Sequence, residues 1–210
     1  MSGSGLAGTA VPRLYAFVKQ PVLGRVKTRL ARDVGATEAT RFYRGVSAAV
    51  LRRLSGDARW RLIAAVDPPA ALGAPIPGWP GRARRVPQAP GDLGARMGAV
   101  FRAARGPTAI IGTDAPALRA HHVATAFDAL RRADAVFGLA EDGGYWLIGL
   151  AGRRAAPDLF KGVRWSSPHA LEDTIASLPR GFRIEEAARL PDVDDGADYA
   201  RAAALGLRGF

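Results

Sequence analysis

Two acidic segments of this sequence contain the first candidates for chemistry. Asp114 comes directly after the apolar run 108–112, and Asp192 and Asp194 lie in the C-terminal stretch PDVDDGADY. Open parallel sheets bind ligands at the carboxyl ends of their strands, and Mg²⁺ and Mn²⁺ take oxygen ligands that they share with substrate phosphates. The pattern indicates a shared cation site, while helix capping is the alternative role for each aspartate.

The segment AEDGGYW places two glycines between an acidic and an aromatic residue. Asp142, Gly143, Gly144 and Tyr145 lie between two apolar runs. Glycines between strands are typical of a hairpin turn, and they also let a ligand approach the backbone closely. The residues alone leave both interpretations open.

A basic loop follows the first apolar run. Within KQPVLGRVKTRL, Gly24 permits a bend, and Lys27 and Arg29 add positive charge beside it. Backbone N–H groups in such a turn, with basic side chains nearby, can bind phosphate. Val26 stands before Lys27 where a P-loop needs glycine, so the segment is not a P-loop. A solvated basic turn is the alternative.

Composition excludes several kinds of site and partner. The chain has no cysteine, which excludes disulfides, thiolate metal sites and cysteine nucleophiles. Its formal charge of +11 is scattered as arginine pairs without aromatic residues between them, so we expect no nucleic-acid partner. No apolar run approaches the roughly 18 residues of a membrane helix. We expect a cytoplasmic protein with no membrane partner.

Short apolar runs alternate with amphipathic segments, which predicts an α/β fold with a mainly parallel central sheet flanked by helices. The 210 residues, 48% of them hydrophobic, suffice for one such domain, so we predict a flexible N-terminal tail over 1–12 and a single domain over 13–210. A helix is predicted to begin near Thr37, and another has Ser167 as its N-cap. Strands are predicted at 13–19, 60–66, 83–87, 108–112, 135–140, 145–150 and 182–186.

Six segments, in this order, resemble one protein family. They are KQPVLGRVKTRL, QAPGDLGARM, IGTDAPAL, AEDGGYWLIGL, LFKGVRWSSP and LPDVDDGADY. Together they resemble the DUF2064 group, also called the radical-SAM/selenodomain-associated transferase 1 family, in the nucleotide-diphospho-sugar transferase superfamily. The resemblance implies a Rossmann-like GT-A fold, a nucleotide donor in the N-terminal half and a divalent cation, Mg²⁺ or Mn²⁺.

The resemblance also implies roles for individual residues. Asp114, Asp192 and Asp194 are the implied metal ligands. Asp142 is the candidate for the base that accepts the acceptor's proton, or for the group that holds the acceptor's hydroxyls, and Lys27 and Arg29 act with it in catalysis. Nucleotide and phosphate binding is assigned to Gly24, Lys27, Thr28, Arg29, Asp92 and Arg96. Acceptor binding is assigned to Gly143, Gly144, Tyr145 and Trp165.

Two reactions fit these residues. The first is glycosyl transfer from a nucleotide-diphospho-sugar to a small-molecule acceptor. The alternative is nucleotidyl transfer from a nucleoside triphosphate to a phosphorylated small molecule, with release of pyrophosphate. Sugar-nucleotide transferases of this fold usually carry Asp-x-Asp, whereas GTDAP supplies Asp114 alone, which keeps the alternative open. The oligomeric state is left open as well.

Overall fold

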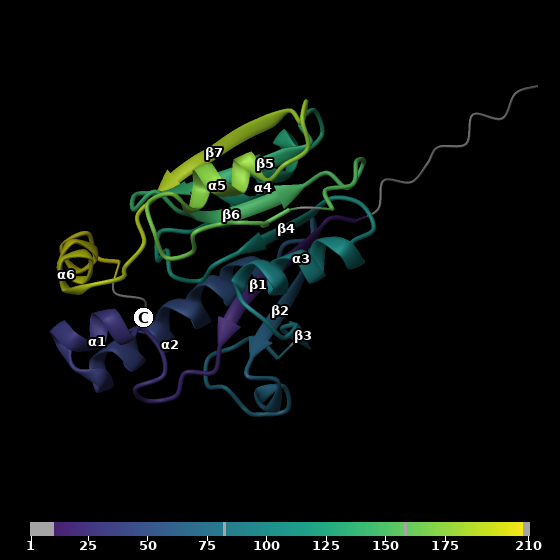
Figure 1. Cartoon of the computed structure of the whole chain (residues 1–210). Helices are drawn as coiled ribbons and strands as arrows, with labels where there is room; N and C mark the ends of the chain where they lie inside the picture. Colours follow the sequence, from purple (N-terminus) through teal and green to yellow (C-terminus); the bar gives the residue numbers. More distant parts are fainter. Residues whose placement is uncertain (1–10, 82, 158, 208–210) are drawn as a thin grey trace, which may run out of the picture.

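A seven-stranded sheet forms the centre of the molecule (Figure 1). The computed structural model describes residues 11–207 except 82 and 158, so most of the predicted N-terminal tail lies outside the described residues. The strands are β1 (Arg13–Lys19), β2 (Arg61–Asp67), β3 (Arg84–Pro87), β4 (Thr108–Ile111), β5 (Ala135–Ala140), β6 (Tyr145–Leu150) and β7 (Ile184–Leu190). Their order in the sheet is β3-β2-β1-β4-β6-β5-β7.

The sheet is parallel except for one strand. Strand β1 pairs in parallel with β2 and β4, β2 with β3, and β5 with β7. Strand β6 runs antiparallel to both of its neighbours, β4 and β5. The predicted mainly parallel sheet is therefore confirmed, and every strand other than β6 ends at the same edge of the sheet.

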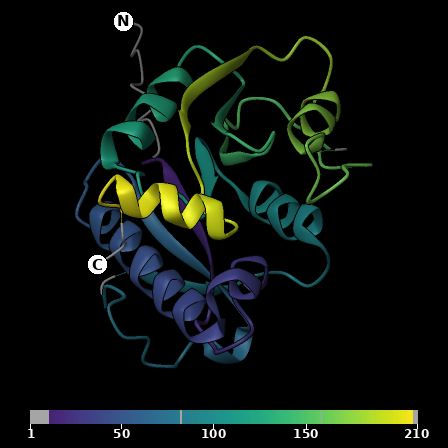
Figure 2. The same cartoon turned by 90° about the vertical axis from the view of Figure 1, so that its left-hand side faces the viewer.

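Helices cover both faces of the sheet. They are α1 (Thr28–Val34), α2 (Ala36–Ser55), α3 (Leu93–Ala103), α4 (Ala120–Ala129), α5 (Ala170–Ala176) and α6 (Gly196–Ala204), with a 3₁₀ turn at Pro69–Ala71. Alternate residues of β1 separate the two cores: Leu14 packs in the core that contains α2 and α4, and Phe17 packs in the one that contains α3 and α5. Helix α6 lies beside α1 at one end of the molecule (Figures 1 and 2).

The positions of the strands were predicted from the sequence more accurately than the residues at which the helices begin. Helix α2 begins at Ala36, close to the predicted Thr37, but Gly35 is its N-cap, and the short helix α1 was not predicted. The prediction of Ser167 as an N-cap is wrong, because α5 begins at Ala170 after His169. The Ser167 hydroxyl instead donates to the carbonyl of Arg164 and accepts from the His169 N–H, so it stabilises a turn before the helix.

Helix lengths and compositions also bear on membranes. Among the residues that the structure describes, no helix combines the length and the apolar character needed to cross a bilayer.

Trp146 links the three neighbouring strands β6, β5 and β7 through side-chain contacts. It belongs to β6, it is 4% exposed, and its indole N–H donates to the carbonyl of Ala188 in β7 at 2.9 Å. Its ring lies over Gly138 of β5, where a Cβ atom would lie 2.4 Å from the ring. Glycine at 138 is therefore required by the close approach of the indole.

We expect Gly138→Ala to lower the free energy of unfolding by about 1–3 kcal/mol, because the added methyl group overlaps a buried ring that cannot move away freely. Denaturant unfolding measures the loss. Gly56→Ala is the matched control, since a Cβ there meets no atom within 4 Å, and we expect a change within about 0.5 kcal/mol. Equal losses in the two variants would contradict this account of Gly138.

Candidate active site

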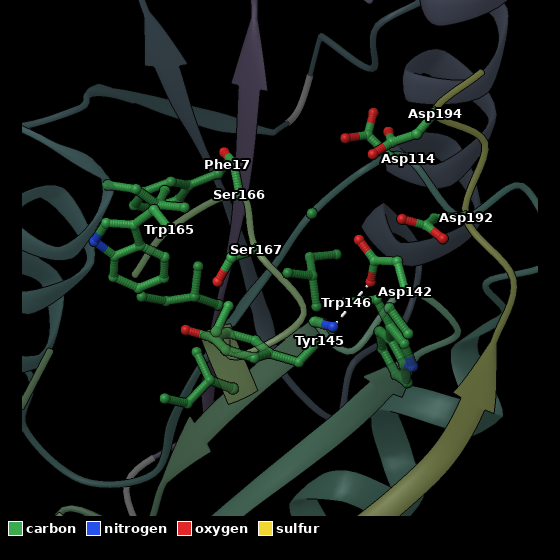
Figure 3. Close-up of a pocket in the computed structure, with 18 of the residues that line it drawn as sticks. Phe17, Asp114, Asp142, Tyr145, Trp146, Trp165, Ser166, Ser167, Asp192 and Asp194 are labelled. Atoms are coloured by element: carbon green, nitrogen blue, oxygen red, sulfur yellow. Dashed lines mark hydrogen bonds between the residues drawn. The ribbon is translucent and has the colours of Figure 1, made fainter. Parts of the chain in front are cut away.

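The loops at the carboxyl edge of the sheet carry the acidic residues singled out from the sequence. Asp114 follows β4, Asp142 follows β5, and Asp192 and Asp194 follow β7. Figure 3 shows these four side chains gathered on one side of a cavity. The strand directions explain the cluster, because β4, β5 and β7 all end at this edge.

Lys27 places a buried positive charge between two of the aspartates. Its Nζ lies 3.1 Å from Oδ1 of Asp114 and 2.8 Å from Oδ1 of Asp194, and its side chain is only 8% exposed. Arg29 adds a second contact, from its Nη1 to Oδ2 of Asp194 at 3.2 Å. The basic loop and two acidic loops therefore meet in one ion-paired group.

This pairing keeps both partners charged. Burial favours the neutral amine of Lys27, but the negative charges of Asp114 and Asp194 outweigh burial, so the pKa of Lys27 is raised. Burial likewise opposes ionisation of Asp194, and the ammonium of Lys27 outweighs it, so the pKa of Asp194 is lowered. Lys27 and Asp194 therefore both stay charged at neutral pH.

Asp142, Asp192 and Asp194 form a second group, of carboxylates alone, which shares Asp194 with the ion-paired group. One carboxylate oxygen from each lies within 4.8 Å of the others. Burial, together with the negative charges of Asp142 and Asp194, raises the pKa of Asp192 to about 6. Three hard oxygen ligands in a region of excess negative charge fit Mg²⁺ or Mn²⁺. Asp114, also predicted as a metal ligand, is ion-paired with Lys27 as Asp194 is, but it does not belong to this group of three, and its role towards a metal stays a prediction.

Two adjoining cavities open at these groups. The first, here called the basic cavity, has a volume of about 580 Å³. Its lining includes Lys19, Lys27, Tyr43, Gln88 and Arg96. The Tyr43 hydroxyl accepts from the N–H of Lys19 at 2.7 Å and so fixes the end of β1 at the cavity wall. Basic side chains and fixed backbone at this wall suit an anionic ligand.

The second cavity, here called the aromatic cavity, has a volume of about 450 Å³. Phe17, Tyr145, Trp146 and Trp165 contribute its aromatic rings, and Figure 3 shows Phe17 and Trp165 on the side away from the aspartates. The Tyr145 hydroxyl hydrogen-bonds to Oγ1 of the buried Thr174 at 3.2 Å, so the ring is held in place.

The two cavities share part of their lining. Both contain Phe17, Leu93, Gly112, Asp114 and Ser166. A Cβ at Gly112 would meet no atom within 4 Å, so glycine leaves the passage open there. A group bound in the basic cavity can therefore reach a molecule bound in the aromatic one beside Asp114.

Unusual backbone occurs at two residues that line these cavities. Lys27 has φ 47° and Ser166 has φ 58°, in the left-handed region that non-glycine residues seldom adopt. The surrounding structure must hold such residues, and they concentrate at binding and catalytic sites. The Lys27 backbone sets the ammonium between its two aspartates directly before α1.

Several predicted residues do not line either cavity. The carboxylate of Asp92 caps α3 by accepting the N–H of Ala95 at 2.8 Å, which is the alternative role of an aspartate before a helix. Gly143 has φ 86° and approaches Pro168 so closely that a Cβ would lie 2.6 Å from its carbonyl oxygen. Neither Gly24 in its turn nor Thr28 at the start of α1 belongs to the lining.

Arg96 lines the basic cavity, but its guanidinium already has hydrogen-bond partners within the protein. Its guanidinium donates to the carbonyl of Gly91 at 2.8 Å and, more weakly, to Gln88 and Asp67 at 3.3 Å. This arrangement braces the loop between β3 and α3. Gln88 itself donates to the carbonyl of Ala65 at 2.9 Å.

Sequence reasoning missed Phe17, Tyr43, Gln88 and Ser166. Gln88 and Ser166 belong to segments that carried the family resemblance, QAPGDLGARM and LFKGVRWSSP, so their context was the available signal. Phe17 and Tyr43 had none, because an aromatic residue in a strand or helix is ordinarily a core residue.

Solved structures of other proteins share this architecture. A proposed nucleotide-diphospho-sugar transferase from Desulfovibrio desulfuricans G20 is 26% identical, with a TM-score of 0.74 and coverage of 93% of each chain. A 4-diphosphocytidyl-2C-methyl-D-erythritol synthase from Anaerococcus prevotii DSM 20548 is 10% identical, with a TM-score of 0.57 over 92% of this chain and 98% of the other. A nucleotidyl transferase from Methanothermobacter thermautotrophicus is 18% identical, with a TM-score of 0.57 over 94% and 99%.

These similarities confirm the nucleotide-diphospho-sugar transferase fold implied by the resemblance. No curated protein sequence matches the chain. The family model described as "Uncharacterized protein conserved in bacteria (DUF2064)" matches residues 50–167, which is more than half of the chain and runs from the last turns of α2 to the loop before α5. The chain therefore belongs to the DUF2064 family.

Proposed function

We propose that this protein is a metal-dependent glycosyltransferase that moves a sugar from a nucleotide-diphospho-sugar to a small-molecule acceptor. The observation that carries the proposal is that Lys27 lines the basic cavity and the three-aspartate group lines the adjoining aromatic cavity, while Asp114, the ion-pair partner of Lys27, lines both. The first cavity suits the anionic donor and the second suits the acceptor.

Lys27 and Arg29 are the residues assigned to the donor diphosphate. Lys27 lines the basic cavity, and Arg29 lies at the edge of the aromatic one, with its side chain 64% exposed. Both stay positively charged, so both can stabilise negative charge that develops on the leaving diphosphate.

Asp142, Asp192 and Asp194 are the residues assigned to a divalent cation. Their oxygens are close enough to share one ion. When bound, Mg²⁺ or Mn²⁺ would supply further neutralisation of the leaving diphosphate. The N–H of Gly144 donates to Oδ1 of Asp142 at 2.9 Å and fixes the orientation of that carboxylate.

In this reaction the bond between the sugar carbon and the donor diphosphate breaks, and a bond from that carbon to an acceptor hydroxyl oxygen forms. The hydroxyl proton passes to the carboxylate of Asp142, the base expected from the sequence, and from there to solvent, and a nucleoside diphosphate is released. The similarity to the D. desulfuricans protein over 93% of both chains supports a sugar-nucleotide donor.

Nucleotidyl transfer is the second candidate function. It is favoured by the buried ammonium of Lys27 beside three carboxylates that can hold a cation, because a triphosphate carries more charge to neutralise than a diphosphate. Lys27 and Arg29 would then act on the phosphates of the triphosphate.

The leaving group distinguishes these reactions. Incubation of the full chain and Mn²⁺ with nucleotide-sugars and, separately, with nucleoside triphosphates and small-molecule acceptors is expected to release a nucleoside diphosphate from one nucleotide-sugar. Chromatography detects the nucleotide product, and a coupled assay detects pyrophosphate. Release of pyrophosphate alone would overturn the glycosyltransferase proposal in favour of nucleotidyl transfer.

We expect Asp142→Asn to weaken Mn²⁺ binding about tenfold or more, because it removes one of three ligand charges. Asparagine keeps the carbonyl oxygen that accepts the Gly144 N–H, so the turn should persist. Calorimetry with saturating nucleoside diphosphate measures the affinity. Asp114→Asn is the matched comparison, and we expect a smaller loss; a loss equal to that of Asp142→Asn would make Asp114 a ligand as well.

We expect Lys27→Met to weaken binding of a nucleoside diphosphate by about tenfold or more, equivalent to roughly 1.4 kcal/mol, while binding of the corresponding nucleoside changes little. The side chain lines the basic cavity and supplies its buried charge. Calorimetric titration with both ligands measures the difference, and thermal unfolding checks that the variant is folded. An equal loss for both ligands would show that Lys27 acts by supporting the loop.

A further inference from the structure

The charges of the aromatic cavity differ from those of the whole chain. The sequence has 30 Lys and Arg against 19 Asp and Glu. The lining of the aromatic cavity reverses this excess, with four aspartates, one arginine and neither lysine nor histidine. The arginine, Arg29, already donates to Asp194 at 3.2 Å.

The positive groups near this cavity lie on the donor side. Lys27 lines the basic cavity and not the aromatic one. A cation on Asp142, Asp192 and Asp194 would lie at the acidic end of the aromatic cavity, next to Asp194, which pairs with Lys27. Away from that end, the described residues that line the cavity offer a phosphate group on the acceptor no charged partner.

The walls away from the aspartates are apolar and fixed. Met97, Ile110 and Ile148 line them together with Tyr145 and Trp165. The Trp165 ring packs against Phe160, with ring centroids 5.7 Å apart, and against Gly94, where a Cβ would lie 3.0 Å from the indole. A rigid ring surface of this kind suits a ring with an apolar face.

One polar group at the passage is free for a ligand. Within the described residues the Ser166 hydroxyl makes no hydrogen bond, and it lines both cavities beside Asp114. The neighbouring Ser167 hydroxyl is used by its own turn. Ser166 can therefore hold an acceptor hydroxyl close to the point of transfer.

We propose that the acceptor is an uncharged, hydroxylated ring compound without a phosphate group, bound with an apolar face against Trp165 and Tyr145. This inference rests on the proposed function and narrows its acceptor class. It distinguishes this acceptor from the phosphorylated small molecule that would be the acceptor in nucleotidyl transfer, the second candidate function.

The test uses the full chain with phenyl glucoside and with its phosphate monoester on the sugar primary hydroxyl, titrated by calorimetry in the presence of Mn²⁺ and a nucleoside diphosphate. We expect phenyl glucoside to bind about tenfold or more tightly than its phosphate ester. Trp165→Leu should weaken phenyl glucoside binding by about fivefold or more, because the ring surface is lost.

Leu93→Lys is the matched charge variant. Leu93 lines both cavities and is 44% exposed, so lysine there adds a positive charge with little effect on packing. We expect it to raise the affinity for the phosphate ester relative to that for phenyl glucoside by about threefold or more.

Equal or tighter binding of the phosphate ester by the unmodified chain would overturn the proposed acceptor class, and so would binding of neither compound. Binding of the nucleoside diphosphate, titrated alone, separates this failure from a failure of the proposed function. Retained diphosphate binding would leave the donor assignment standing, whereas its absence would overturn the proposed function itself.

Discussion

The ion pairs of Lys27 with Asp114 and Asp194 are the interaction on which the site depends. They join the loops that follow β1, β4 and β7. Strand β7 is the outermost strand on the side of the sheet opposite to β3, three strands away from β4. An ammonium that is 8% exposed needs both carboxylates, because a buried charge without partners is strongly unfavourable. The loops are thus held together by the same charges that are available to a ligand.

A single lysine leaves the acidic side of the site incompletely neutralised. Lys27 compensates Asp114 and Asp194, while Asp192 remains close to Asp142 and has its pKa raised. Burial and the negative charges of Asp142 and Asp194 both disfavour the ionised form of Asp192. A bound divalent cation would offset this unfavourable charge, so the three carboxylates suit such an ion.

The fold and much of this site were predictable because they follow from local patterns. Apolar runs identified most of the strands, although β7 (Ile184–Leu190) was predicted at 182–186. The rule that ligands bind at the carboxyl ends of parallel strands pointed to Asp114, while the position of Asp142 was left open between a hairpin turn and a ligand site. Helix α1 escaped prediction, since it has seven residues with only Leu30 buried and no side-chain cap. Sequence spacing also could not show that Asp114 faces Lys27, because that contact depends on the left-handed backbone of Lys27.

The direction of β6 explains why acceptor and cation residues occur so close together in the sequence. A parallel strand would need a crossover connection to reach its neighbour, whereas β5 and β6 form a hairpin at the carboxyl edge. The turn places Asp142 next to Asp192 and Asp194. Strand β6 begins after it with Tyr145, whose side chain lines the aromatic cavity. The segment EDGG is therefore both a hairpin turn and part of the site, so its two interpretations from the sequence are compatible. Gly143 is required by its close approach to Pro168, while Asp142 and Tyr145 on either side of the glycines line the aromatic cavity.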